Sequence, residues 1–209
     1  LAARTAENIG MAQREGSVQS HVRIGQPDFG PLIPAGGADL MLAFEPAEAV
    51  RSLGILKPGG VALVNTAAIH PVTVTLGKSR YDEAEMRRFL QEKAPGVKFV
   101  PGTELAVEAG NIKTVNVVML GAAAGLGILP FGPEVLLETL LAMIPAKVLD
   151  VNKRAFELAW VLRASDTASG FEEVLPNQFG KVPPVILTGM LDKLQRNVTL
   201  STSDLSGGV

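Results

Sequence analysis

The fold is decided by residues 38–64, which read ADLMLAFEPAEAVRSLGILKPGGVALV. Two short apolar runs, 38–44 and 61–64, each follow a glycine pair, as is typical of strands buried on both faces of a sheet. Between them, Pro46 opens and Gly54 closes a helical stretch, the asymmetry favoured at helix ends. The stretch therefore predicts a right-handed β-α-β unit in an α/β fold, with an open, mostly parallel, Rossmann-like sheet flanked by helices.

Weaker patterns extend this alternation in both directions. Residues 18–24 alternate apolar or small side chains with polar ones, which predicts a half-buried strand. Towards the C-terminus we expect a helix at 82–93, a strand at 97–100, and helices at 103–110 with Thr103 as N-cap, 113–124, 133–143 and 152–163. The second half is thus mainly helical. We assign residues 1–163 to one domain and the Ser-, Thr-, Gly- and Pro-containing residues 164–209 to an extension or linker.

Composition excludes several classes of chemistry. The 209 residues include no cysteine, which excludes disulfides, thiolate nucleophiles, iron–sulfur clusters and thiolate zinc sites. His21 lies on the polar side of the 18–24 strand, and His70 precedes a proline. Neither histidine has an obvious serine or aspartate beside it that would form a catalytic arrangement with the ring. We therefore expect no metal site and no catalytic histidine. The net charge of −2 comes from interspersed charges, so we expect no nucleic-acid partner.

The longest apolar stretch, residues 115–129, is shorter than the roughly 20 residues that span a bilayer, and it predicts a buried helix. Its glycines Gly121, Gly125 and Gly127 favour close helix packing over contact with a ligand. The first residues have neither the basic start nor the apolar core of a secretory signal. We expect a cytoplasmic chain without a membrane partner.

A candidate anion-binding loop, GMAQREGS, lies directly before the 18–24 strand at residues 10–17. Glycines allow the backbone to approach a ligand, an arginine clamps phosphate or carboxylate, and amide and hydroxyl groups add neutral hydrogen bonds. The residues that supply these groups are Gly10, Gln13, Arg14, Gly16 and Ser17. No general phosphate-loop pattern is matched, so a glycine-containing turn with a solvated arginine is an equally good interpretation.

Three more polar residues are candidate ligand contacts. Asn65 and Thr66 directly follow the 61–64 strand, where open α/β sheets bind ligands, although a strand-end residue also caps turns. Asn116 lies in the apolar helical stretch, where an unpaired buried amide costs roughly 1 to 3 kcal/mol, so we expect a backbone or ligand partner. Glu45 also follows a strand, but the helix dipole alone favours a carboxylate at this position.

Residues 10–25, GMAQREGSVQSHVRIG, closely resemble the segment that marks the gamma-type domain of 2-oxoacid:ferredoxin oxidoreductases, nearest to the indolepyruvate type. The likeness continues through PLIPAGGADLMLAFEPAEAVR at 31–51, LKPGGVALVNT at 56–66 and GNIKTVNVVMLGA at 110–122. It fades after about Arg163. Several segments in the order of the family make the resemblance specific.

The resemblance implies a subunit of a thiamine diphosphate-dependent enzyme. Such an enzyme oxidatively decarboxylates a 2-oxo acid, transfers the acyl group to coenzyme A and passes electrons to ferredoxin. In this family the thiamine diphosphate and the iron–sulfur clusters belong to other domains or to an alpha-type partner subunit, and ferredoxin is an indirect partner. The gamma-type domain is associated with capture of coenzyme A as co-substrate, and the absence of cysteine in this chain fits that division.

Two departures from the family pattern stand out. The family domain opens with a strand, a GxGGQG loop and a helix, and the sequence contains no such loop. Residues 1–6, LAARTA, resemble a remnant of that helix, so we expect the first strand, its loop and the second strand to be absent from this sequence. Glu15 stands where the family commonly has glycine, which alters the charge of the candidate loop.

Two other functions remain open. LKPGGVALV at 56–64 resembles a late strand region of S-adenosylmethionine-dependent methyltransferases, but the acidic, glycine-rich loop of those enzymes is missing. Alternatively, the chain is a non-catalytic assembly subunit whose loops only dock a partner. Saturable binding of coenzyme A that depends on Arg14 distinguishes ligand capture from docking alone.

Overall fold

The computed structural model describes residues 2–9, 17–25, 29–70, 74, 80–166 and 185–188. Its strands are β1 Ala2–Ile9, β2 Val18–Gly25, β3 Ala38–Ala43, β4 Leu56–Asn65, β5 Val97–Val100 and β6 Val185–Thr188. Its α-helices are α1 Pro46–Ser52, α3 Glu83–Lys93, α4 Gly102–Ala109, α5 Val115–Gly125, α6 Pro133–Met143 and α7 Leu149–Asp166. Short 3-10 helices are η1 Leu53–Ile55, η2 Ile112–Thr114 and η3 Ala146–Val148.

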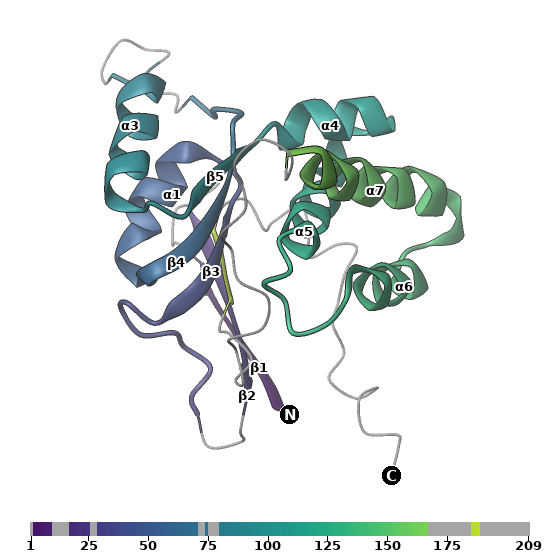
Figure 1. Cartoon of the computed structure of the whole chain (residues 1–209), viewed down its shortest axis with the longest axis horizontal. Helices are drawn as coiled ribbons and strands as arrows, with labels where there is room; N and C mark the ends of the chain where they lie inside the picture. Colours follow the sequence, from purple (N-terminus) through teal and green to yellow (C-terminus); the bar gives the residue numbers. More distant parts are fainter. Residues whose placement is uncertain are drawn as a thin grey trace.

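The strands form one sheet in the order β1-β2-β6-β3-β4-β5 (Figure 1). Strands β6, β3, β4 and β5 are parallel neighbours, whereas β2 runs antiparallel to both β1 and β6. The predicted parallel β-α-β unit is therefore confirmed as β3-α1-β4. An antiparallel hairpin, β1–β2, extends the sheet on one side.

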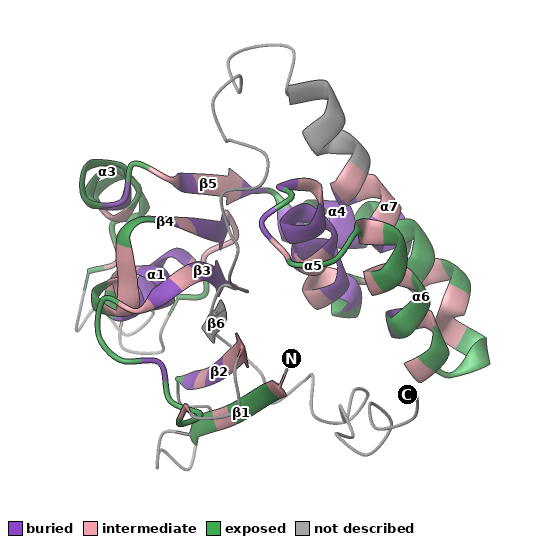
Figure 2. Ribbon diagram, turned by 60° about the horizontal axis from the view of Figure 1, so that its bottom comes forward, coloured by how far each residue is buried: buried purple, intermediate pink, exposed green. Residues whose placement is uncertain are grey.

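Helices cover both faces of the parallel part of the sheet, with α1 and α3 on one side and α4 to α7 on the other (Figure 2). The period-2 alternation of a strand divides the side chains of β3 between the two layers. Leu40 and Leu42 pack in the same apolar cluster as α4, α5 and α7, whereas Met41 and Ala43 pack with α1 and α3. Because both faces are buried, β3 reads as a continuous apolar run, as the sequence predicts.

Most helix boundaries follow local signals. Pro46 occupies the first turn of α1, and the Asp82 carboxylate accepts a hydrogen bond from the Glu85 amide at the start of α3. Gly110 ends α4 in the left-handed region with φ of 113°, which a glycine adopts without strain. The helix predicted at 133–143 is confirmed as α6 without change.

Three helix starts differ from the prediction. Pro101, not Thr103, is the N-cap residue of α4, and Thr103 lies in the first turn, where its side chain bonds to another element. Helix α5 begins two residues later than expected because residues 112–114 form a 3-10 turn capped by Asn111. Helix α7 begins at Leu149, directly after η3.

The predicted helical remnant at the start of the chain is wrong. Residues Ala2–Ile9 form strand β1, which pairs with β2 from Ala2 opposite Gly25 to Ile9 opposite Val18. Alanine, arginine and glutamate favour a helix locally. For each residue, however, this preference is worth only tenths of a kcal/mol, up to roughly 0.7 kcal/mol. A continuous ladder with β2 outweighs it, so tertiary pairing decides the conformation of this segment.

Strand β6 comes from the region that the sequence assigns to an extension or linker. It lies between β2 and β3, inside the sheet, although it follows α7 in the chain. Local patterns miss it because it is four residues long and stands between two prolines and a glycine. Among the described helices, none combines the length and the apolar character that a bilayer crossing requires.

Candidate functional site

One edge of the sheet collects the ends of its strands. The strand registers align Asn8, Gln19, Thr188, Ala43, Val64 and Phe99 on a single line across the sheet. All five of the strands β1, β3, β4, β5 and β6 end on this line or one residue beyond it, and β2 begins one residue beyond it. The chain therefore leaves β1 and enters β2 at this edge. This is the carboxyl edge of the parallel strands, where open α/β sheets bind ligands.

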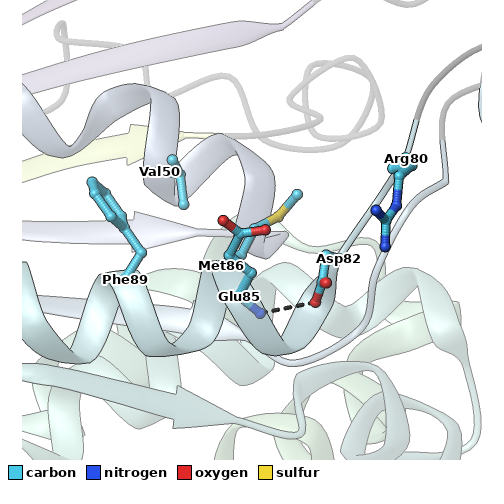
Figure 3. Close-up of a pocket in the computed structure, with 6 residues that line it drawn as sticks. All are labelled: Val50, Arg80, Asp82, Glu85, Met86 and Phe89. Atoms are coloured by element: carbon cyan, nitrogen blue, oxygen red, sulfur yellow. Dashed lines mark hydrogen bonds between the residues drawn. The ribbon is translucent and has the colours of Figure 1, made fainter.

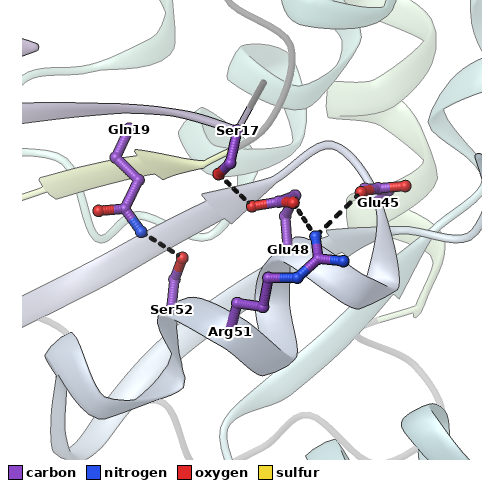
Figure 4. Close-up of polar contacts among 6 residues, drawn as sticks. All are labelled: Ser17, Gln19, Glu45, Glu48, Arg51 and Ser52. Atoms are coloured by element: carbon purple, nitrogen blue, oxygen red, sulfur yellow. Dashed lines mark hydrogen bonds and ion pairs between the residues drawn. The ribbon is translucent and has the colours of Figure 1, made fainter. Parts of the chain in front are cut away.

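Of the candidate loop residues, one lies within the described part of the chain. Gly10, Gln13, Arg14 and Gly16 lie outside the described residues, whereas Ser17 is described. Ser17 Oγ lies 2.5 Å from Glu48 Oε2 on α1, to which it donates a hydrogen bond (Figure 4). The C-terminal flank of the predicted loop is therefore attached to the helix that follows β3.

Charged side chains surround this attachment point (Figure 4). Arg51 donates a hydrogen bond to Glu48 and its Nη1 lies 3.9 Å from Glu45 Oε1. One turn along α1, Gln19 Nε2 donates a 2.8 Å hydrogen bond to Ser52 Oγ. The two carboxylates and one guanidinium sum to a single negative charge beside Ser17. An anionic ligand near Ser17 therefore needs additional positive charge.

Asn65 lies at the end of β4 with 3% of its surface exposed. Its Nδ2 donates to Phe44 O at 3.1 Å and to Thr103 Oγ1 at 3.0 Å, and its Oδ1 accepts from Thr103 N at 3.2 Å. The amide thus joins the ends of β3 and β4 to the first turn of α4, and both of its N–H groups are engaged by protein atoms. A ligand contact through Nδ2 would require one of these bonds to break.

Thr66 and Asn116 differ in how well their polar atoms are satisfied. The Thr66 backbone N donates to Val100 O at 2.9 Å, which fixes the chain at the end of β4. Asn116 Oδ1 on α5 is buried and has no hydrogen-bond partner among the described residues. The expected partner of Asn116 is therefore not found for this oxygen. The structure joins Asn65 to Thr103 and Ser17 to Glu48, and no side-chain hydrogen bond among these described residues links the two pairs.

A buried acid and a buried phenol lie beside this edge: Glu45, for which the sequence favoured a helix-dipole role, and Tyr81, which sequence reasoning missed. Glu45 Oε2 is buried without a hydrogen-bond partner in the described part of the chain, and Tyr81 Oη is buried beside the backbone of Ala47. Burial, and then repulsion from Glu48, raises the pKa of Glu45 above its ordinary value. Burial, and then the nearby charge of Glu45, raises the pKa of Tyr81. The position of Glu45 after a strand was a usable signal, whereas nothing local marks Tyr81.

Replacing Glu45 with glutamine is expected to lower the pKa of Tyr81 while leaving it above the ordinary value, because burial is the larger cause. Tyr81 is the sole tyrosine of the chain, so an ultraviolet titration of tyrosinate reports on this group alone. Glu92→Gln on α3 is the matched control, since Glu92 is exposed and does not act on Tyr81. Equal titration curves for Glu45→Gln and the wild type would contradict the assignment.

The same variant is expected to change how stability depends on pH. A carboxyl group whose pKa is raised by folding binds its proton more tightly in the folded than in the unfolded chain. The stabilising contribution of the Glu45 carboxyl group is therefore fully present at pH values below its pKa in the unfolded chain. It is lost as the pH rises through the pKa of this group in the folded chain. In thermal unfolding measurements, the wild-type chain should lose more stability over this pH interval than the Glu45→Gln variant does. A pH profile that is parallel for both proteins would argue against a raised pKa.

His21 is buried, which corrects its assignment to a polar strand face. It is 3% exposed, and its Nδ1 accepts a 3.2 Å hydrogen bond from the backbone N of Ile33. The segment before β3 covers this side of β2, so the polar residues of the alternating pattern do not all face solvent. Burial lowers the pKa of His21. The Nδ1 atom of this ring therefore makes a structural contact with the segment before β3.

A separate pocket lies between α1 and α3 (Figure 3). Its volume is about 520 Å³, within the range of roughly 300 to 1,000 Å³ that is common for ligand sites. Apolar side chains and charged groups share its lining, which comprises Val50, Arg80, Asp82, Glu85, Met86 and Phe89. None of the residues predicted to bind a ligand lines it. Among the described residues, no group of three or more histidine or acidic side chains is arranged to hold a metal ion.

Comparison with known proteins identifies the family. Residues 1–161 match the family described as pyruvate ferredoxin/flavodoxin oxidoreductase. The indolepyruvate oxidoreductase subunit IorB of Thermococcus kodakarensis is 41% identical over 157 residues, which cover 74% of this chain and 78% of that protein. The IorB subunit of Archaeoglobus fulgidus is also 41% identical over 157 residues, which cover 75% of this chain and 78% of that protein.

Two solved structures share the fold. The gamma subunit of a keto/oxoacid ferredoxin oxidoreductase from Geobacter sulfurreducens PCA has a TM-score of 0.51 at 17% identity, covering 78% of this chain and 80% of its own. Pyruvate oxidoreductase subunit PORC from Thermotoga maritima has a TM-score of 0.52 at 21% identity, covering 77% and 79%. The α/β fold and the resemblance found in the sequence are both confirmed. This chain belongs to the pyruvate ferredoxin/flavodoxin oxidoreductase family, and its relatives are oxidoreductase subunits.

Proposed function

We propose that this chain is the coenzyme A-handling, gamma-type subunit of a thiamine diphosphate-dependent, indolepyruvate-like 2-oxoacid:ferredoxin oxidoreductase. In the proposed reaction a 2-oxo acid loses carbon dioxide, its acyl group passes to coenzyme A, and two electrons leave towards ferredoxin. The observation that carries the proposal is the family match over residues 1–161, together with relatives named as indolepyruvate oxidoreductase subunits. A cytoplasmic location is part of the proposal.

The redox and thiamine cofactors are assigned to an alpha-type partner subunit. Iron–sulfur clusters need thiolate ligands, and the chain has no cysteine. When bound to the partner, thiamine diphosphate would supply the chemistry that removes carbon dioxide. Ferredoxin then interacts with the complex rather than with this chain directly.

The proposed role of this chain is to hold coenzyme A at the carboxyl edge of its sheet. Arg14 is proposed to contact a phosphate or pyrophosphate, while Gln13, Ser17 and Asn65 orient the ligand. The position of Ser17 at this edge supports the proposal, because the 10–17 loop starts and ends there. The single negative formal charge of Glu45, Glu48 and Arg51 makes a cationic contact from Arg14 more important to the proposal, because an anionic ligand beside Ser17 needs additional positive charge.

Arg14→Ala is expected to raise the concentration of coenzyme A needed for half-maximal turnover of the reconstituted complex by about 10- to 100-fold. This range follows from the loss of one charge-assisted hydrogen bond, roughly 1.5 to 3 kcal/mol. The measurement is a steady-state titration of coenzyme A with the partner subunit present. Arg154→Ala is the matched control, because Arg154 is an exposed arginine on α7.

The same titration separates the proposed function from docking alone. If Arg14→Ala leaves the coenzyme A dependence unchanged while the chain is still required for an active complex, this subunit only supports assembly. The family match favours the oxidoreductase over the methyltransferase alternative. Lack of saturable coenzyme A binding by the wild-type complex would remove the proposed role of this chain altogether.

A further inference from the structure

Helix α6 is rich in apolar residues but is only partly covered by the rest of the protein. Its sequence is PEVLLETLLAM, and of these 11 described residues Leu140 alone is buried. Leu136, Leu137 and Leu141 are partly buried and pack against the same apolar cluster as Leu140. The helix lies at the rim of the layer formed by α4 to α7, on the side away from the sheet (Figure 1, Figure 2). One side of α6 therefore packs inward, and the opposite side faces outward.

Two adjacent rows of side chains run along the outward side of α6. Residues three and four positions apart are neighbours on the surface of a helix. Val135, Thr139 and Ala142 therefore form one row, and Glu134 and Glu138 form a second row beside it. All five residues are exposed, and the exposed fraction of Val135 is 55%. The outward side of α6 thus combines an uncharged row with an acidic row.

The uncharged row needs no polar partner from outside the helix. Thr139 Oγ1 donates a 2.7 Å hydrogen bond to the carbonyl oxygen of Val135. An apolar surface that covered this row would therefore leave no hydroxyl group unpaired. Phe131, just before α6, is 38% exposed and adds apolar surface at the N-terminal end of the helix. Single exposed apolar side chains are ordinary, whereas a row of them that continues along a helix marks a contact surface.

The charge of this side of α6 selects the kind of partner. Glu134 and Glu138 are the only charged residues of α6, and neither forms an ion pair within the described part of the chain. A second copy of α6 would bring two more carboxylates against them, and like charges across an interface cost free energy. Anionic lipid head groups would be repelled for the same reason. A protein surface with apolar side chains beside lysine or arginine has the complementary chemistry.

We propose that the outward side of α6 docks the thiamine diphosphate-bearing partner subunit, through an apolar surface of that subunit that is edged by lysine or arginine. The inference rests on the proposed function, from which it takes the partner. Val135 is the apolar anchor, because it is the most exposed apolar side chain of the helix and lies in the uncharged row. Glu134 and Glu138 accept hydrogen bonds from the basic edge and orient the two subunits.

Equilibrium binding of the full-length chain to the partner subunit, without coenzyme A or 2-oxo acid, tests the inference. Val135→Glu is expected to raise the Kd about tenfold or more, because it places a charge in the apolar part of the interface. Glu134→Lys combined with Glu138→Lys is expected to slow association at low salt, and added salt should reduce this defect. These three side chains are exposed, so both variants should keep the wild-type melting temperature.

Helix α4 provides matched control variants. It carries an exposed valine, Val107, with an exposed fraction of 58%, and two exposed glutamates four positions apart, Glu104 and Glu108. Val107→Glu, and Glu104→Lys combined with Glu108→Lys, introduce the same changes of charge on another helix. Both control variants should bind the partner subunit with the wild-type Kd and association rate.

The outcomes separate this inference from the proposed function. Weaker binding by the α6 variants, with unchanged binding by the α4 variants, supports docking on α6. Wild-type affinity in the α6 variants, or equal losses in the α6 and α4 variants, overturns the inference and leaves the proposed function standing. A homodimer of the wild-type chain that Val135→Glu dissociates in sedimentation measurements also overturns it, since a second copy then covers α6. No binding of the wild-type chain to the partner subunit overturns the inference and the proposed function together.

Discussion

Replacing Gly121 with alanine is expected to destabilise the folded chain by about 3 kcal/mol. Gly121 lies where α5 packs against α7, and a methyl group there would come within 2.4 Å of Phe156 O and 3.1 Å of Phe156 Cα. These are backbone atoms, so relief requires the two helices to move apart. Phe156 is fully buried between them, so such a movement also loosens its packing.

The higher helix propensity of alanine opposes this destabilisation, but its effect is smaller. Alanine has a higher helix propensity than glycine by about 1 kcal/mol, which on its own would stabilise α5. The steric clash must exceed this gain for the expected sign to hold. Chemical denaturation followed by circular dichroism gives the change in free energy, and Trp160 on α7, the only tryptophan, gives a second optical probe.

Gly54→Ala is the matched control for this prediction. A methyl group at Gly54 meets no atom within 4 Å, so the substitution should change the free energy of unfolding by less than about 1 kcal/mol. If Gly121→Ala is as stable as Gly54→Ala, the helices do not approach as closely as the structure indicates.

Asn65→Leu is expected to cost about 3 kcal/mol of folding free energy. The leucine side chain has a similar size but cannot bond to Phe44 O, Thr103 N or Thr103 Oγ1. Each buried polar group left without a partner costs about 1 to 3 kcal/mol, reduced where the group finds water. The ends of β3 and β4 and the start of α4 should loosen together.

A double-mutant cycle identifies the cause. Thr103→Val removes only the hydroxyl partner and should cost less than Asn65→Leu, and the two losses combined should be less than additive. Thr103→Ser keeps the hydroxyl and serves as the control. If Asn65→Leu keeps full stability but impairs turnover of the complex, the residue acts on the ligand rather than on the fold.

Much of the parallel core could be predicted from local patterns. The apolar runs of β3 and β4 indicate burial on both faces, and Pro46, Asp82 and Gly110 mark helix ends through their own backbone preferences. The close packing expected of Gly121 is confirmed by its approach to Phe156. Apart from the contact between Gly121 and Phe156, these features depend on neighbouring residues alone.

The candidate site was less predictable. Ser17 and Asn65 were identified from their positions, but their hydrogen-bond partners, Glu48 and Thr103, lie 31 and 38 residues away in sequence. Glu45 and Tyr81 have the same character, because burial is the main cause of both raised pKa values and the charge of Glu45 further raises the pKa of Tyr81. Contacts between distant segments leave no periodic signal.

The sequence by itself determined the parallel β-α-β core, the family and the lack of any thiolate chemistry in this chain. Only the tertiary structure decided that residues 2–9 form a strand, that Val185–Thr188 lies between β2 and β3, and that Asn65 binds α4. The physical reason is the range of the interactions. Side-chain periodicity and backbone preference act over a few residues, whereas strand pairing and buried hydrogen bonds join segments that meet only after the chain has folded.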